Sequence, residues 1–250
     1  MKPLTYYIPN SITLLNLLFG CVAVILALRG WTSFAGYCIF MAAVCDFLDG
    51  LSARLLKAYS EMGKQLDSLA DMVSFGVAPG VMLYQEMYRI LSPRITMGFD
   101  TVGWELLLFA PFILTLFSAL RLAKFNIDAR QREGFLGLPT PACALLVASF
   151  LIYARTHSAL DPFIHEWSLL GAVVALSALM VVNLPMPAMK FKGLAWASNK
   201  LRYVFLLICA AIVLFTLVAE EDFTLAVVLI ILSYILYSLC LYAGKLVKKN

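Results

Sequence analysis

The sequence predicts an all-α, polytopic membrane protein, and three observations lead to this fold class. Of the 250 residues, 62% are hydrophobic and only 14% are charged, whereas a soluble globular domain carries about 25% charged residues. Apolar runs of about 20 residues, the length that crosses a bilayer, occur eight times. The Lys and Arg residues gather in alternate connections between these runs. A soluble domain is therefore excluded, and we expect an integral, multi-pass membrane protein.

The predicted spans follow one another with short connections. They cover Ile8–Leu28, Trp31–Leu56, Lys64–Glu86, Trp104–Phe125, Leu138–Arg155, Trp167–Met186, Leu201–Val218 and Phe223–Leu246. Pro9 marks the start of the first span, and a hairpin around Tyr59–Met62 joins the second to the third. Trp104 opens the fourth, as interfacial tryptophans do.

The later spans have equally clear boundaries. Pro185 and Pro187 end the sixth span because proline cannot continue a helix, and the acidic run Glu220–Asp222 separates the last two. We therefore expect a core of six transmembrane helices over residues 1–186 and a C-terminal extension of two helices over residues 187–250.

The distribution of positive charge predicts the orientation. With a cytoplasmic N-terminus, all 19 Lys and Arg residues except Arg29, Arg89, Arg94 and Arg155 lie on the cytoplasmic side, which is the side that basic residues favour. An even number of spans returns the C-terminus to the same side. Both termini and the connection between the second and third spans should therefore be cytoplasmic. No basic run with interleaved aromatic residues indicates a nucleic-acid partner.

Four aspartates stand out in this apolar chain. Asp46, Asp49, Asp67 and Asp71 lie in the stretch DFLDGLSARLLKAYSEMGKQLDSLAD. A carboxylate inside a membrane costs at least ~2.5 kcal/mol, so four together require a compensating charge. Oxygen ligands without Cys or His favour Mg²⁺ or Mn²⁺, with Ca²⁺ also suited, over zinc. The stretch therefore predicts a site for two divalent cations.

Helical spacing places these carboxylates on two facing stripes. One stripe holds Asp46, Asp49, Gly50 and Ala53, and the other holds Gly63, Asp67 and Asp71. The small residues permit close approach of a helix or a ligand, and Arg54 adds a guanidinium suited to phosphate oxygens. Two cations in such a site form a clamp for a diphosphate, and a carboxylate left partly free can accept a proton from a nucleophile.

The aspartates have two other interpretations. Intramembrane carboxylates also line proton or cation pathways, and some are simply solvated at a helix end. A transport pathway does not need an arginine beside small residues, which favours the diphosphate site. A carboxylate-lined cation transporter is kept as an alternative.

The spacing D-x2-D-G-x2-A-R-x8-G-x3-D-x3-D resembles the signature of the CDP-alcohol phosphotransferases, and all its defined positions are present. The resemblance implies a six-helix core, usually a homodimer, that replaces CMP of a CDP-linked lipid or alcohol by the hydroxyl of an acceptor. It implies that the four aspartates are metal ligands and that Asp71 is also the general base. It assigns CDP binding to Gly50, Ala53, Arg54 and Gly63.

Further segments resemble the phosphatidylserine synthase branch of this family. They are IPNSITLLNLLFG, SLADMVSFGVAPG, SALRLAKFN and FLGLPTPA. This branch implies CDP-diacylglycerol and L-serine as substrates, and phosphatidylserine and CMP as products, in phospholipid biosynthesis. A sister activity with glycerol 3-phosphate, an inositol phosphate or choline remains an alternative because the signature does not bind the acceptor.

Polar residues outside the signature are candidates for the remaining contacts. Serine brings a carboxylate, an ammonium and a hydroxyl, and Arg121, Lys124 and Asn126 lie at the depth of the signature. The resemblance of SALRLAKFN to the phosphatidylserine synthase branch implies that these residues bind serine or lipid phosphate. The alternative is that the two basic residues only anchor the helix at the interface. Asn10 and Thr13 either contact CDP or cap the first helix, and we favour the cap.

Overall fold

The computed structural model describes residues 7–96, 101–127, 135–186, 196–219 and 221–247. The helices are α1 (Tyr7–Leu28), α2 (Thr32–Leu55), α3 (Glu61–Asp71), α4 (Ala78–Thr96), α5 (Thr101–Leu108), α6 (Phe112–Ile127), α7 (Thr140–Thr156), α8 (Glu166–Val181), α9 (Trp196–Val218) and α10 (Phe223–Val247). A π-helical segment, η2 (Met72–Val77), joins α3 to α4, and a 3₁₀ segment, η4 (Ser158–Phe163), precedes α8. Two short strands, β1 (Phe135–Leu136) and β2 (Pro185–Met186), pair antiparallel. The predicted all-α fold class is confirmed.

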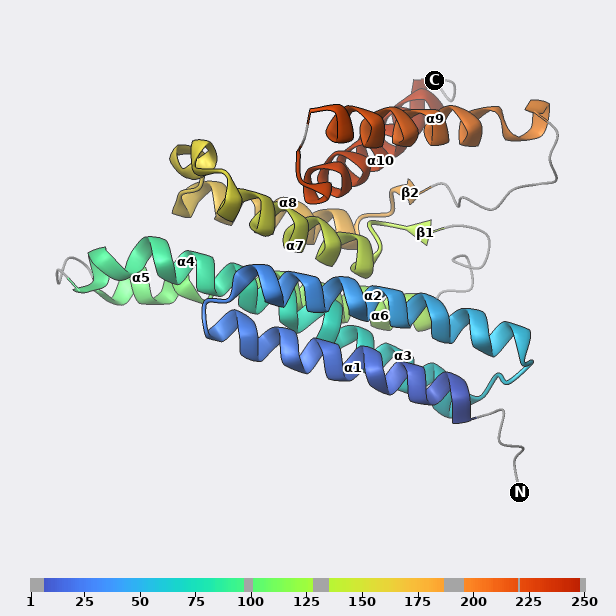
Figure 1. Cartoon of the computed structure of the whole chain (residues 1–250), viewed down its shortest axis with the longest axis horizontal. Helices are drawn as coiled ribbons and strands as arrows, with labels where there is room; N and C mark the ends of the chain where they lie inside the picture. Colours follow the sequence, from blue (N-terminus) through green and yellow to red (C-terminus); the bar gives the residue numbers. More distant parts are fainter. Residues whose placement is uncertain (1–6, 97–100, 128–134, 187–195, 220, 248–250) are drawn as a thin grey trace.

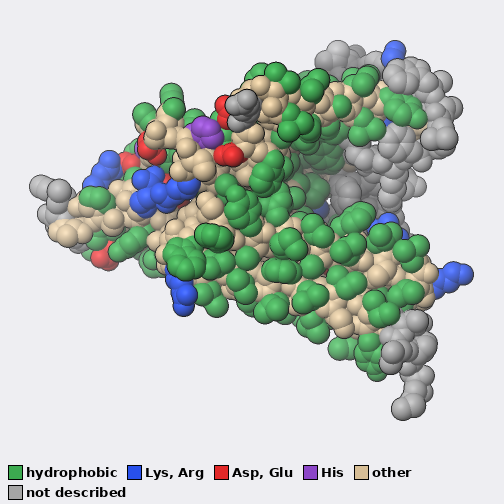
Figure 2. Space-filling view, viewed as in Figure 1, with side chains coloured by type: hydrophobic (Ala, Val, Ile, Leu, Met, Phe, Trp, Pro, Cys, Tyr) green, Lys and Arg blue, Asp and Glu red, His purple; other side chains and the backbone are tan. Residues whose placement is uncertain are grey.

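Among the described residues, six helices are long and apolar enough to cross a membrane. They are α1, α2, the continuous helix from Glu61 to Thr96, the helix over Val102–Ile127, α9 and α10, whereas α7 and α8 are apolar but shorter. Figure 2 shows hydrophobic side chains along the length of the bundle and charged side chains gathered toward its ends. This distribution fits an integral, multi-pass membrane protein.

The helices of the N-terminal half run side by side along the long axis, with α7 and α8 covering one side and α9 and α10 outermost (Figure 1). The first two helices are held close by small residues, since Ala23 and Ala27 of α1 and Ala35 and Ala42 of α2 are fully buried. Small side chains let two backbones approach and gain dispersion energy, which drives helix association in lipid.

The turn between α1 and α2 follows directly from one glycine. Gly30 has a φ of +76°, the left-handed region that glycine reaches without strain. Its N–H donates to Ala27 O over 2.8 Å, and Trp31 N–H donates to Leu26 O over 2.9 Å. These two bonds close α1 with a Schellman motif, and the chain reverses into α2.

The predicted bounds of the third and sixth spans are wrong. The third span was expected over Lys64–Glu86, but the helix runs from Glu61 to Thr96 and contains Pro93 near its end. The fourth span, expected over Trp104–Phe125, corresponds to the observed span Val102–Ile127. Within it a tight turn at 109–111 separates α5 from α6, because Pro111 has no N–H to donate to the helix.

The sixth span was expected to reach Met186, but α8 ends at Val181. The chain after α8 pairs with a distant segment instead of continuing the helix. Gly137 N–H donates to Leu184 O over 2.9 Å, and Leu138 N–H donates to Leu179 O over 2.8 Å. The predicted division at residue 186 stays a prediction, and residues 187–195 lie outside the described residues.

Two smaller expectations are also corrected. The connection between α2 and α3 spans residues 56–60, slightly earlier than the predicted Tyr59–Met62 hairpin, and the Ser60 hydroxyl accepts the Gly63 N–H over 2.9 Å to cap α3. Asn10 is the fourth residue of α1, so neither it nor Thr13 caps that helix. The helix begins before Pro9 because proline is tolerated in a first turn, where its missing N–H is not needed.

Candidate metal and nucleotide site

Three of the four predicted metal ligands converge. One carboxylate oxygen from each of Asp46, Asp49 and Asp67 lies within 4.8 Å of the other two. Two of these residues come from α2 and one from α3, which reverses direction after the short connection. Asp49 is buried and the other two are half-buried. Three like charges this close require cations or shared protons, and the donor set consists only of oxygen, as Mg²⁺ and Mn²⁺ prefer.

Asp71 lies deeper in the bundle, one helical turn beyond Asp67. It is 9% exposed and interacts electrostatically with Asp46 and Asp67. Its Oδ1 accepts a hydrogen bond from Asn16 Nδ2 over 3.2 Å. Asn16 is fully buried in α1, and its own Oδ1 has no partner among the described residues. The fourth carboxylate is therefore fixed from α1, behind the three that converge.

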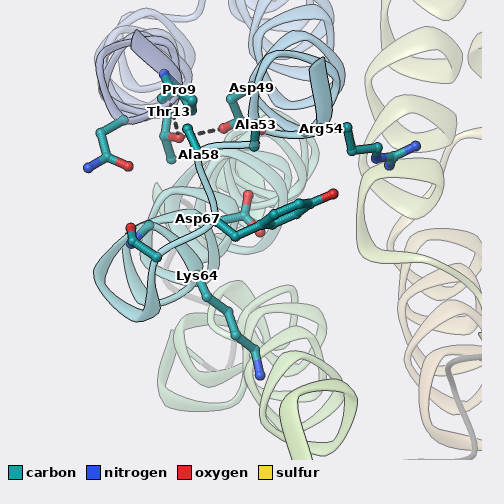
Figure 3. A pocket seen from close by; sticks show the side chains of 13 residues that line it. Pro9, Thr13, Asp49, Ala53, Arg54, Ala58, Lys64 and Asp67 are labelled. Atoms are coloured by element: carbon teal, nitrogen blue, oxygen red, sulfur yellow. Dashed lines mark hydrogen bonds between the residues drawn. The ribbon is translucent and has the colours of Figure 1, made fainter. Parts of the chain in front are cut away.

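A cavity of about 250 Å³ opens beside these carboxylates. Every residue assigned to CDP from the sequence lines it: Asn10, Thr13, Gly50, Ala53, Arg54 and Gly63. Asp49 and Asp67 line the same cavity, so the cavity adjoins the carboxylate cluster directly. Figure 3 shows these side chains arriving from α1, α2 and α3.

One hydroxyl joins α1 to the cluster. Thr13 Oγ1 lies 2.6 Å from Asp49 Oδ2 and 3.0 Å from Pro9 O, and the dashed lines in Figure 3 mark both contacts. On the opposite wall a Cβ at Gly63 would come within 3.0 Å of Asn10 Oδ1. Glycine there keeps the start of α3 close to α1 without closing the cavity.

The two basic residues that line the cavity, Arg54 and Lys64, lie at its rim. Arg54 is exposed, and Figure 3 shows its guanidinium directed away from Thr13 and Asp49. Lys64 extends toward α6, where its Nζ lies 3.5 Å from Asn126 O. Both side chains are long and exposed, so they can turn toward a phosphate at the mouth of the cavity.

The residues assigned to serine or lipid phosphate separate into two environments. Arg121 is 5% exposed, donates from Nη1 to Thr140 Oγ1 over 2.9 Å and interacts electrostatically with Asp71. Its Nε is buried without a partner among the described residues. Lys124 instead donates to Asn183 Oδ1 over 2.7 Å, at the end of α8.

Asn126 Nδ2 donates to Ser68 Oγ over 2.9 Å and so ties α6 to α3. Of the three residues, Arg121 is the one that the structure places beside a predicted catalytic carboxylate.

Asn16, Ser68 and Thr140 were missed in the sequence. Asn16 is the one with a detectable signal, because it follows Thr13 at helical spacing and is a polar residue inside a transmembrane run. Ser68 and Thr140 lie in the segments SLADMVSFGVAPG and FLGLPTPA quoted for the family resemblance, but a hydroxyl at a helix boundary is too common to indicate a site by itself.

Comparison with known proteins shows the family of this chain. The profile of the CDP-alcohol phosphatidyltransferase family matches residues 6–185. The chain belongs to this family. Its members are transferases, and the match contains the aspartate cluster, the cavity and Arg121.

Several relatives of this CDP-alcohol phosphatidyltransferase carry the name CDP-diacylglycerol–serine O-phosphatidyltransferase. The protein from Mycobacterium leprae is 36% identical over 189 residues, which are 73% of this chain and 58% of the relative. The protein from Helicobacter pylori is 31% identical over 210 residues, 83% of this chain and 81% of the relative. The protein from Bacillus subtilis is 35% identical over 146 residues, 58% of this chain and 76% of the relative.

Proposed function

We propose that this protein transfers the phosphatidyl group of CDP-diacylglycerol to the hydroxyl of L-serine, which gives phosphatidylserine and CMP in phospholipid biosynthesis. The observation that carries the proposal is the single cavity that joins the residues assigned to CDP to the carboxylate cluster. The names of the relatives support serine as the acceptor.

The carboxylates fit a pair of divalent cations. Asp46, Asp49 and Asp67 converge with oxygen ligands alone, and Asp71 interacts electrostatically with all three. We assign these residues to two Mg²⁺ or Mn²⁺ ions, with Ca²⁺ also matching the donor type. When bound, the ions would neutralise the diphosphate and stabilise the leaving CMP.

The reaction we propose is a single displacement. The serine hydroxyl oxygen forms a bond to the phosphorus that carries diacylglycerol, and the bond from this phosphorus to the CMP oxygen breaks. Asp71 accepts the hydroxyl proton, and Asn16 holds its carboxylate in place. Among the described residues, no Cys or His lines this cavity. The Ser60 hydroxyl caps α3, and the Thr13 hydroxyl contacts Asp49 and the Pro9 carbonyl.

Arg121 is our candidate for the serine carboxylate. Its guanidinium is buried beside Asp71, and Nε has no protein partner among the described residues. An arginine with unused donors in a buried position is suited to a planar carboxylate. Lys124 and Asn126 stay assigned to the serine or lipid-phosphate region, with their observed contacts to Asn183 and Ser68 as the competing structural role.

We also propose that the site and both termini face the cytoplasm and that the protein is a homodimer. The orientation is supported by the charge count, and the dimer by the family resemblance alone. Single cysteines introduced at Tyr59 and Ser158 of a chain without its native cysteines test the orientation. An impermeant maleimide added to intact cells should label only the second, and labelling of the first alone would reverse the orientation.

Purified protein incubated with CDP-diacylglycerol, Mn²⁺ and serine tests the reaction. We expect CMP and phosphatidylserine in equal amounts, and no product when a chelator removes the metal. CMP release only with glycerol 3-phosphate, an inositol phosphate or choline would assign a sister activity. Cation flux in liposomes without CMP release would favour a transporter.

A further inference from the structure

A second polar cavity lies at the opposite end of the bundle from the aspartates. It measures about 670 Å³ and is open to the surface. The turn between α1 and α2 forms one wall, and Gln85 and Arg89 of α4 with Arg155 of α7 form the other. In Figure 1 this turn and the end of α7 lie at the end of the bundle away from the connection between α2 and α3.

The arginines beside this cavity outnumber the carboxylates that they contact. Glu86 is 2% exposed, and both of its oxygens are engaged. Arg89 reaches Oε1 over 2.6 Å and Arg155 reaches Oε2 over 2.6 Å. Two guanidinium groups thus share one carboxylate. Asp161 acts on Arg89 electrostatically at longer range, but it is exposed to solvent, which screens it.

Both guanidinium groups keep unused donors. Arg89 donates to Glu86 from Nε and Nη2, and Arg155 donates from Nη2, whereas each guanidinium carries five N–H groups. The other N–H groups have no protein partner in the part of the chain that the structure describes. Because Glu86 holds both side chains in place, these donors are fixed beside the cavity rather than free on long side chains.

The rest of the lining defines what would fit. Ser33 and Gln85 add uncharged polar groups, and no lining residue is acidic. Trp31 and Phe34 are exposed, and their rings lie 6.1 Å apart at the rim. Aromatic rings at this position are typical of the membrane interface, where the glycerol and upper acyl chains of a lipid would lie.

From this geometry we infer a binding site for the phosphate of an anionic phospholipid headgroup, in the leaflet opposite the aspartate cavity. The unused guanidinium N–H groups bind the phosphate oxygens, Ser33 and Gln85 contact the polar headgroup, and the aromatic pair contacts the glycerol region. A headgroup with an ammonium would find no carboxylate among the lining residues, so an anionic lipid whose headgroup alcohol is uncharged, such as phosphatidylglycerol, is favoured.

Native mass spectrometry of the purified protein tests this site with dioleoyl phosphatidylglycerol, dioleoyl phosphatidylethanolamine and dioleoylglycerol as competing probes. We expect phosphatidylglycerol to be retained in preference to the other two. Equal retention of all three lipids would overturn the site, and equal retention of the two phospholipids would overturn the headgroup assignment. Binding of inorganic phosphate without phosphatidylglycerol would overturn the lipid as the source of the phosphate.

Substitutions at Ser33 and Gln85 distinguish lipid retained at this site from lipid retained in the aspartate cavity, which also accepts lipid under the proposed function. Ser33→Glu places a carboxylate in the cavity without breaking the Glu86 pairs, and it should lower phosphatidylglycerol retention about tenfold, a change of about 1.4 kcal/mol. Ser33→Gln is similar in size but neutral and should retain the lipid. Gln85→Glu is a second variant with the same expected loss. Undiminished retention by both acidic variants would overturn the site.

Discussion

At the scale of single residues, the candidate site depends on side chains of α1 that hold the carboxylates of α2 and α3. Thr13 contacts Asp49, and Asn16 contacts Asp71. Hydrogen bonds of this kind fix the orientation of a metal ligand or a base. Their loss typically lowers metal affinity or activity by about 10–100-fold.

Thr13→Val should weaken the binding of the divalent cations without unfolding the protein. The variant keeps the shape of threonine but loses the hydroxyl that lies 2.6 Å from Asp49 Oδ2. We expect the Mn²⁺ concentration for half-maximal CMP release to rise about tenfold. Thr13→Ser keeps the hydroxyl and should behave as the native protein. An equal loss in both variants would assign the effect to packing instead.

Asp71→Asn should abolish turnover, and Asn16→Ala should lower kcat about 10–100-fold. The first change removes the proposed base, and the second removes the donor that lies 3.2 Å from its Oδ1. If Asn16 only positions Asp71, the KM values for serine and CDP-diacylglycerol should stay unchanged. A control is Ser149→Ala, which alters a buried hydroxyl of α7 that has no hydrogen-bond partner among the described residues. A native kcat in Asn16→Ala would remove its proposed role.

The sequence predicted the residues of the cavity better than the contacts that orient them. Helical spacing alone indicates that Asp46 and Asp49 share a face, because both lie on one helix. The Asn16–Asp71 and Asn126–Ser68 contacts join residues of different helices that are more than 50 positions apart in the chain. No local pattern specifies such pairs, since they depend on how the helices rotate against one another.

At the scale of secondary-structure elements, the π-helical segment η2 directly follows Asp71. Its Gly76 carbonyl accepts a hydrogen bond from the Thr115 hydroxyl of α6 over 2.9 Å. Its Ser74 hydroxyl donates to Asn16 O of α1 over 2.9 Å. The segment thus bonds to two neighbouring helices, and π-helical turns inside α-helices occur frequently at functional sites.

Gly20→Ala should separate α1 from η2. An added Cβ would lie 2.3 Å from Ser74 Oγ and 2.9 Å from Ser74 Cα, so the backbones must move apart. We expect the free energy of unfolding to fall by about 1–3 kcal/mol, which is observed as a Tm lower by several degrees. Gly171→Ala in α8 is the matched control, because nothing lies within 4 Å of its added Cβ, and its Tm should be equal or higher. A drop of the same size in both variants would contradict close packing at Gly20.

The elements themselves show where sequence patterns end. α1 and α2 match their apolar runs closely, since membrane helices must bond their own backbone. The predicted end of the sixth span was wrong because the carbonyl of Leu179 accepts from Leu138 N–H and that of Leu184 accepts from Gly137 N–H. That pairing is tertiary, so hydropathy, which reports composition, cannot reveal it.

At the scale of the whole molecule, the basic residues that break the charge pattern are mostly paired. Arg89 and Arg155 bind Glu86, and Arg94 forms a salt bridge with Glu166 and lies 5.1 Å from the Trp104 ring. Arg155 therefore joins α7 to α4 and Arg94 joins α4 to α8, whereas the pair of Arg89 and Glu86 lies within α4. Two carboxylates thus face three of these arginines, and the orientation is drawn from the larger number of basic residues on the other side.

The C-terminal helices provide the last prediction. The family match ends at residue 185, yet α10 packs against α7 as well as against α9, and Val228, Ile231 and Ile235 belong to the main core cluster. In a membrane, lipid can replace a lost helix as an apolar neighbour, but it packs less closely.

A chain that ends after residue 186 should therefore keep the transfer activity of the proposed catalytic core at low temperature and unfold at a lower temperature than the full chain. Val228→Ala with Ile231→Ala in the full chain should reproduce part of the loss in Tm. An unchanged Tm on truncation would contradict the packing argument, and an inactive but equally stable truncated protein would contradict the division at residue 186.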